Sequence, residues 1–144
     1  MSGIIGSTGG SGIIGATELD YEEGEWDPGH PSFTFDATPP GQYIKIGKMV
    51  TCWGYFAFSS ADSHNSFFTG LPFTADNTDS NDSSGTVTSN DITFTGGANW
   101  ITPYVHNNTK TWSFYASADA AGWSGTFTSS TISSMYFMIV YKAA

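Results

Sequence analysis

Residues 48–59 read Lys-Met-Val-Thr-Cys-Trp-Gly-Tyr-Phe-Ala-Phe-Ser, and this stretch decides the fold class. Successive side chains of a β-strand point to opposite faces, so the stretch divides into two sets. One set is Val50, Cys52, Gly54, Phe56 and Phe58, and the other is Met49, Thr51, Trp53, Tyr55 and Ala57. A strand with one face in water should alternate apolar with polar residues. Both sets are largely apolar here, so we expect a strand that is central in a covered sheet or buried against another subunit.

The stretch Thr131–Lys142 has the same character. Its apolar residues fall into one set of Met135, Phe137, Ile139 and Tyr141 and another of Tyr136, Met138 and Val140. A β-sandwich covers one face of each sheet, and a second copy of the chain would cover the other. We therefore predict a homo-oligomer with an interface that includes Met49, Trp53, Tyr55, Tyr136 and Met138.

The rest of the chain also alternates with a period of two residues, between turns rich in Gly, Pro, Asn and Ser. The further strands that we expect are 32–36, 42–47, 84–88, 91–95, 100–106 and 110–118. In the last of these, Trp112 should point inward and Ser113 and Ser117 outward. Asn107-Asn108 suits a hairpin turn, because Asn tolerates a positive φ. Since no segment has a helical period, the sequence predicts an all-β fold, either a β-sandwich or a jelly roll.

The segment Leu19–Pro28 leads into this body and is acidic. Pro28 fixes its own φ and keeps Asp27 out of the helical region, so we expect an extended strand closed by a turn at Pro28-Gly29. Glu22 and Glu23 would lie on opposite faces and cannot flank one glycosidic bond as a catalytic pair does. Glu23 and Glu25 share a face, which favours a solvated edge or a contact with a basic partner.

Residues 1–17 contain a repeat, since Ser-Gly-Ile-Ile-Gly occurs at 2–6 and again at 11–15. Gly at this density does not hold a helix. A flexible tail is one interpretation, but a linker gains nothing from two exposed Ile-Ile pairs. We predict an extended attachment arm at 1–17, ahead of a β-sandwich body at 18–144. The residues expected to anchor the arm to a partner are Ile4, Ile5, Ile13 and Ile14.

The composition excludes some partners and compartments. The 144 residues carry 4 Lys+Arg and 13 Asp+Glu, a net charge of -9, which disfavours nucleic acids and anionic membranes. No stretch approaches the roughly 20 apolar residues of a membrane helix, and we expect no signal peptide. Cys52, the single cysteine, excludes an intrachain disulfide and should be a buried small hydrophobe, with an interchain bond as the remaining alternative.

We expect no catalytic residue, no cofactor and no required metal. His30, His64 and His106 share no ligand spacing and fit surface turns. The loop Asp76–Asp82 holds three acids that could bind Ca²⁺, but it lacks the Gly and Glu of an EF-hand, so a solvated loop is the expectation.

Three short motifs occur in order across about the first half of the chain: Tyr21–Gly24 with Trp26 and Pro28, then Tyr43–Gly47, then Gly70–Phe73. This combination resembles a module of tailed-bacteriophage virion proteins, especially those of marine phages, that occurs in head-decoration and tail-fibre proteins. Glu25 and Asp27 replace the small or hydroxyl residues of that module and make this edge more acidic.

The resemblance implies a non-enzymatic virion structural protein, either a capsid decoration or a head-fibre component. It would be a homotrimer that binds capsid or tail proteins, located on the virion surface after assembly in the host cytoplasm. The alternative is the receptor-binding tip of a tail fibre that binds host surface glycans. Aromatic residues near Asn, Asp and Ser loops would suit sugar rings, namely Trp100, Tyr104, Trp112, Tyr115 and Trp123. The alternative role for all of them is packing in the core. Trp123 lies in a Gly-rich break and is the one expected to be exposed.

Overall fold

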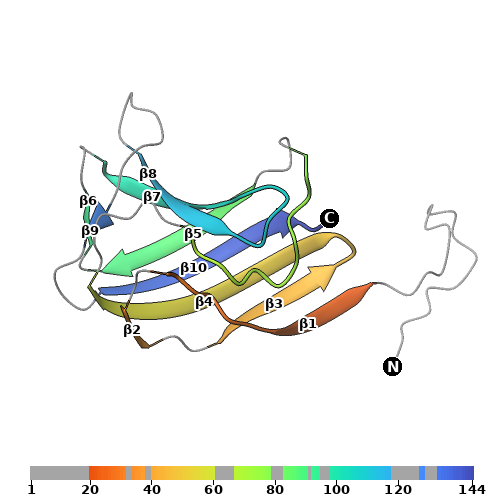
Figure 1. Ribbon diagram of the computed structural model, residues 1–144, viewed down its shortest axis with the longest axis horizontal. Helices are drawn as coiled ribbons and strands as arrows, with labels where there is room; N and C mark the ends of the chain where they lie inside the picture. The colour runs from red at the N-terminus through yellow and green to blue at the C-terminus, as the bar shows by residue number, and fades with distance from the viewer. Residues whose placement is uncertain are drawn as a thin grey trace, which may run out of the picture.

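The computed structural model describes residues 20–31, 34–37, 40–60, 67–78, 83–90, 92–94, 98–117, 127–128 and 133–144. In this part of the chain there are ten β-strands and no helix (Figure 1). The strands are β1 (Tyr21–Trp26), β2 (Thr34–Ala37), β3 (Gly41–Ile46), β4 (Met49–Ser60), β5 (Ser83–Asn90), β6 (Thr93–Phe94), β7 (Trp100–Val105), β8 (Trp112–Ser117), β9 (Phe127–Thr128) and β10 (Ser133–Lys142). The all-β prediction is confirmed. The predicted arm, 1–17, lies outside the described residues.

The main sheet runs in the order β1-β3-β4-β10-β5-β7-β8, with β2 also paired to β4. Every pairing is antiparallel. Strands β1, β3, β4, β10 and β5 form one broad curved layer, and β7 and β8 lie over it (Figure 1). The core lies between these two layers, which is the sandwich arrangement. We call the side of β1, β3, β4, β10 and β5 that faces away from the core the outer face.

The two long strands β4 and β10 form the centre of the layer. They pair over the whole of β10, from Ser133 opposite Phe58 to Lys142 opposite Met49. Their inner side chains are buried, as the alternation predicts: Val50, Cys52, Phe56 and Phe58 of β4, and Met135, Phe137, Ile139 and Tyr141 of β10.

A short segment between β4 and β5 joins the two ends of the sheet. The backbone groups of Phe68 bond with those of Trp112 in β8, at N···O distances of 2.7 and 3.0 Å. The next residue, Thr69, bonds in the same way with Gly29, just after β1, at 3.1 and 2.8 Å. The expected turn at Pro28-Gly29 is therefore wrong: the chain stays extended there, because Gly29 finds its backbone partners in Thr69.

Gly70 makes this closure sterically possible. Its φ is +96°, a conformation that L side chains rarely adopt. A Cβ at this position would overlap the carbonyl oxygen of Asp27. Only glycine allows the two backbones to approach so closely.

Aromatic rings fill the core. Phe68 stacks on Trp112 with ring centroids 4.4 Å apart, and Phe56 stacks on Phe68 at 5.4 Å. Trp112 also contacts Phe137 at 4.8 Å, and Trp26 contacts Phe137 edge-on at 6.0 Å. The indole N–H of Trp26 donates to the Gln42 carbonyl at 3.2 Å, so the last residue of β1 is held by both packing and a hydrogen bond.

Cys52 is fully buried and not in a disulfide, which confirms its prediction as a core hydrophobe. Burial raises the pKa of its thiol from 9.0 to about 12. Burial also raises the pKa of Tyr141, although the Phe73 N–H donates to its hydroxyl oxygen at 3.1 Å and opposes this effect.

Some local predictions are corrected by the structure. Ser113 and Ser117 were expected to be solvent-exposed, yet both are buried. They do lie on the side of β8 away from Trp112, and the Ser113 hydroxyl there is 2.8 Å from Nε2 of His106. The hairpin turn at Asn107-Asn108 is confirmed, with φ of 54° at Asn108. In the strand expected at 91–95, β6 is Thr93–Phe94 and Ile92 lies outside it, while positions 91 and 95 are not among the described residues.

We predict that Gly70→Ala lowers the free energy of unfolding by more than about 3 kcal/mol, because the new methyl group must displace the Asp27 backbone as well as adopt a strained φ. Gly47→Ala is the matched control. Gly47 also has a positive φ, +57°, but nothing lies within 4 Å of an added Cβ. Gly47→Ala should lower the free energy of unfolding by roughly 1–2 kcal/mol. Urea denaturation of both variants measures the difference, and equal losses would contradict the closure described above.

We predict that stability falls as the pH rises from about 9 towards 12. In this window the unfolded chain loses the Cys52 proton while the folded chain keeps it, so ionisation favours the unfolded state. Cys52→Ala should have a shallower fall, with part remaining because the pKa of Tyr141 is also raised. Denaturation midpoints across this pH range test the slope, and an unchanged slope in the variant would refute the assignment.

Candidate functional site

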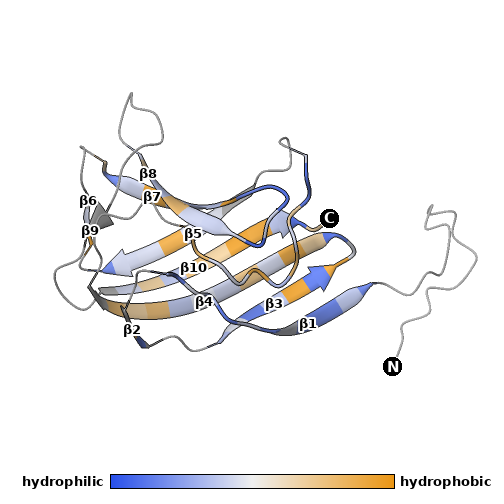
Figure 2. Cartoon of the chain, in the orientation of Figure 1, coloured by the Kyte–Doolittle hydropathy of each residue, from blue (hydrophilic) through white to orange (hydrophobic). Residues whose placement is uncertain are grey.

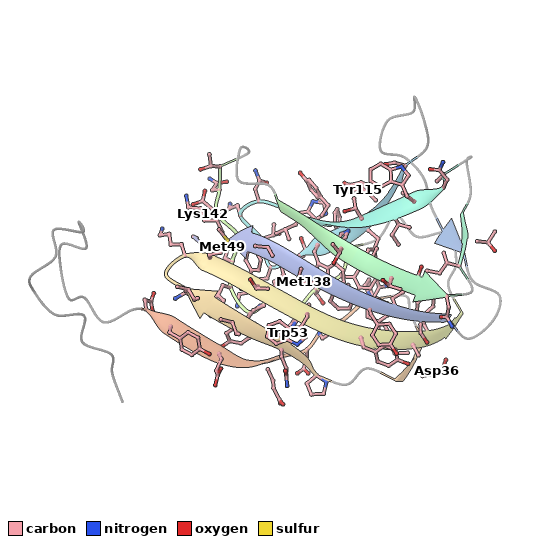
Figure 3. The ribbon with its side chains drawn as sticks, turned by 180° about the vertical axis from the view of Figure 1, so that it is seen from behind. Asp36, Met49, Trp53, Tyr115, Met138 and Lys142 are labelled. Atoms are coloured by element: carbon pink, nitrogen blue, oxygen red, sulfur yellow. The ribbon has the colours of Figure 1, made fainter. Side chains whose placement is uncertain are left out.

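The five residues predicted for an oligomer interface lie together on the outer face. Trp53 is opposite Met138, and Tyr55 is opposite Tyr136, in the β4–β10 ladder. Met49 is at the start of the same face of β4. Figure 3 shows Met49, Trp53 and Met138 on one side of the sheet. Directly opposed residues of antiparallel strands share a face, so the register brings the five together.

These large apolar and aromatic side chains are unusually exposed to solvent. Tyr136 is 59% exposed, Met49 53% and Met138 41%, while Trp53 and Tyr55 are half-buried. The rings of Tyr55 and Tyr136 contact each other with centroids 4.7 Å apart. Ile46, at the end of β3, adds a further side chain at 48% exposure. Contiguous apolar residues on an open face mark an interaction surface.

A groove of about 320 Å³ lies beside this patch, across β1, β3 and β4. Its walls are Glu23, Gly24, Glu25, Gln42, Tyr43, Ile44 and Trp53. Glu23 is opposite Ile44, and Glu25 is opposite Gln42, so the two carboxylates approach from the β1 side. The Trp53 indole approaches from the β4 side. The groove thus combines negative charge on one wall with an aromatic ring on the other.

The acidic side chains of β1 accept hydrogen bonds from two tyrosines, one in β1 and one in β3. Strand β1 is largely hydrophilic (Figure 2). The Tyr43 hydroxyl donates to Glu22 at 2.7 Å, and the Tyr21 hydroxyl donates to Glu23. Each of these hydrogen bonds raises the pKa of its tyrosine, because ionisation would bring a second negative charge beside the carboxylate. Glu22 and Glu23 therefore have separate partners.

A second group of rings lies on the side of β7 and β8 away from the core. Tyr104 contacts Tyr115 at 5.1 Å and His106 at 5.1 Å, and Phe67 contacts His106 at 4.6 Å. Trp100, on the same side of β7, is 54% exposed. Trp112, which sequence reasoning grouped with these aromatics, is fully buried instead, because it lies on the other side of β8.

The candidates for catalysis and metal binding are dispersed in the described part of the chain. His106 is half-buried among rings, and His30 lies 4.7 Å from the Phe68 ring, so neither is a simple surface turn residue. Asp76 pairs with Lys142 at 3.2 Å and accepts a hydrogen bond from the Thr78 N–H. Within the described ranges, no three His, Cys, Asp or Glu side chains are grouped as a metal site would need.

Several predicted site residues fall outside the described residues. They are Ile4, Ile5, Ile13, Ile14, Trp123, His64, Asp79 and Asp82. In the part that is described, the chain contains no helix long and apolar enough to cross a membrane.

No family model, no curated protein and no solved structure matches this chain.

Sequence reasoning found the residues of the outer patch but missed the groove. The signal was present, since Glu23, Glu25 and Trp53 were each singled out. What was missing was the register of β1 on β3 and β3 on β4, which brings Glu25, Gln42 and Trp53 side by side.

Proposed function

We propose that the protein is a non-enzymatic structural component of a tailed-bacteriophage particle, a capsid decoration or head-fibre protein. The observation that carries this proposal is the exposed apolar patch on the outer face, formed by Met49, Trp53, Tyr55, Tyr136 and Met138. A surface of this kind suits permanent association with other copies of the chain. Fully burying one large apolar side chain contributes roughly 1.5–3 kcal/mol, so a few of them suffice to favour assembly.

The three motifs behind the phage resemblance support a structural role, because they pack together in space. Gly70 of the third motif lies against the backbone beside Pro28 of the first. Phe73 of the third contacts Tyr43 of the second edge-on at 5.3 Å, and Lys45 lies 5.5 Å from the centre of the Phe73 ring. Their residues hold β1, β3 and the 67–76 segment to one another. This is a structural use of the motifs rather than a catalytic one.

The resemblance favours a trimer of the body on the virion surface. Attachment would use residues 1–17, with Ile4, Ile5, Ile13 and Ile14 entering a groove on a capsid or tail protein. Assembly would take place in the host cytoplasm. Fixing seventeen residues costs about 1–2 kcal/mol each, so the arm also needs backbone hydrogen bonds from its partner.

A second candidate function is binding of host glycans at the tip of a tail fibre. The ring group of Trp100, Tyr104, His106 and Tyr115 favours it, since half-exposed rings beside hydroxyl groups suit sugar faces. Trp123 is the further residue predicted for this role. Immunogold labelling that places the protein at fibre tips would favour this candidate over the first.

We predict that the intact chain is a homo-oligomer, with the mass of a trimer, at micromolar concentration. Met138→Glu and Tyr136→Glu should shift it to a monomer without unfolding it, because each introduces a charge into the buried interface. Asn77→Glu, in an exposed loop, adds the same charge elsewhere and should leave the mass unchanged. Light scattering gives the masses, and a monomeric wild type would refute the assembly.

We predict that the protein is found on the heads of phage particles by immunogold labelling. Deleting residues 2–15, or replacing both Ile-Ile pairs by Ser-Ser, should leave a folded body that no longer joins particles. The Ser variant keeps the arm length, so it separates apolar anchoring from simple reach. Wild-type occupancy by either variant would contradict the attachment role, as would absence of the wild-type protein from particles.

A further inference from the structure

The two edge strands of the main sheet, β8 and β1, differ in the backbone partners on their second sides. At one end, β8 is paired on its second side at its first residue, since Trp112 exchanges two backbone hydrogen bonds with Phe68. At the other end, β1 pairs with β3 along its whole length, and its second side pairs with none of the described residues. The pairing between Gly29 and Thr69 begins only after the strand has ended. Within the described part of the chain, strand β1 thus presents an open edge.

The register shows which backbone groups face this open edge. Asp20 is opposite Gly47, and its carbonyl accepts from the Gly47 N–H at 2.7 Å. Backbone groups alternate in direction along an antiparallel strand. The N–H and C=O groups of Tyr21, Glu23 and Glu25 therefore point away from β3. The side chains of the same three residues lie on the outer face, beside the groove.

The composition of this edge prevents pairing with a second copy of itself. Natural edge strands are usually protected by Lys, Pro, a bulge or short length, and β1 has six residues with none of the first three features. It has Glu22, Glu23 and Glu25 instead. Two β1 strands side by side would bring like charges together, which is destabilising. A strand with positive charges would meet attraction at the same edge.

This chain cannot supply such a strand itself. It contains no arginine, and its four basic residues are Lys45, Lys48, Lys110 and Lys142. Lys45 pairs with Asp20 at 2.9 Å and Lys142 with Asp76 at 3.2 Å. Lys110 donates to the Pro72 carbonyl at 2.9 Å, and Lys48 is in the β3–β4 turn. Residues 1–17 contain no basic residue. The complementary charge must come from a different protein.

We propose that the open edge of β1 binds an extended, arginine- or lysine-bearing segment of another protein by strand addition. The backbone of the segment bonds to Tyr21, Glu23 and Glu25, which is the established mode of β-augmentation. One cationic side chain enters the groove, between the carboxylates of Glu23 and Glu25 and the indole of Trp53. Arginine suits this place best, because its planar guanidinium pairs with carboxylates and stacks on aromatic rings.

This inference goes beyond the proposed function, since an acidic open edge would bind a basic strand whatever the role of the body. The predicted self-assembly uses the β4 and β10 part of the outer face, which meets the groove at Trp53, whereas the open edge and its two carboxylates belong to β1. Loss of oligomerisation and loss of basic-strand binding are therefore distinguishable.

The test uses the full chain and a synthetic peptide about six residues long, a typical strand length, in which arginine alternates with threonine. Calorimetric titration should show saturable binding with one peptide per chain, weakening as salt is raised above about 0.15 M. The same peptide with glutamate in place of arginine should not bind. Glu23→Gln combined with Glu25→Gln should weaken binding by about tenfold or more.

Two variants separate the edge from general charge attraction. Glu22→Gln removes the same charge, but the Glu22 side chain lies on the opposite face of β1 from the groove and accepts from the Tyr43 hydroxyl, so binding should be nearly unchanged. Glu23→Pro removes an N–H that faces the open edge and keeps the β3 ladder, so it should weaken binding more than Glu23→Gln. Equal effects of Glu22→Gln and Glu23→Gln would overturn the proposal. Binding that appears only after deletion of residues 2–15 would also overturn it, because the arm would then be the natural occupant.

Discussion

The rest of this structure depends on the ladder between β4 and β10. It is formed by the two longest strands at the centre of the curved layer. Its inner side contributes Phe56, Phe137 and other buried side chains to the core. Because both strands are also apolar on their other side, the same ladder exposes Trp53 and Met138 on the outer face. One pairing therefore contributes both the centre of the core and the exposed apolar patch for which self-assembly is proposed.

The closure at Phe68 links that core to the edges of the sheet. Phe68 pairs with β8 through its backbone and stacks on Trp112 through its ring, while the next two residues fix the chain that leaves β1. Among the described residues, the β8 edge is thereby paired at Trp112, and β1 has no partner on its second side. The acidic side chains of β1 therefore lie on a strand that pairs with β3 along its whole length, as the proposed strand addition requires.

Much of the fold could be predicted from the sequence, because period-two alternation fixes which side chains share a face of each strand. The inner and outer sets of β4 and β10 follow directly from it. Alternation does not fix long-range pairing. The bond between Gly29 and Thr69, the role of Gly70 and the groove beside Glu23 and Trp53 all depend on register between segments far apart in the chain. Ser113 was placed on the correct side but assigned the wrong burial, since alternation does not show that His106 lies beside its hydroxyl.

The central claim is that the β4 and β10 part of the outer face is buried between copies of the chain, and methionine oxidation measures this directly. Hydrogen peroxide treatment followed by mass spectrometry gives a rate for each methionine in the same sample. Met135 is fully buried in the body and serves as the internal reference, whereas Met49 and Met138 are exposed in a single copy. The account predicts that, at micromolar concentration, Met49 and Met138 oxidise nearly as slowly as Met135 and become fast in the Tyr136→Glu variant. Rapid oxidation of Met49 and Met138 in the wild-type protein, with Met135 still protected, would contradict it.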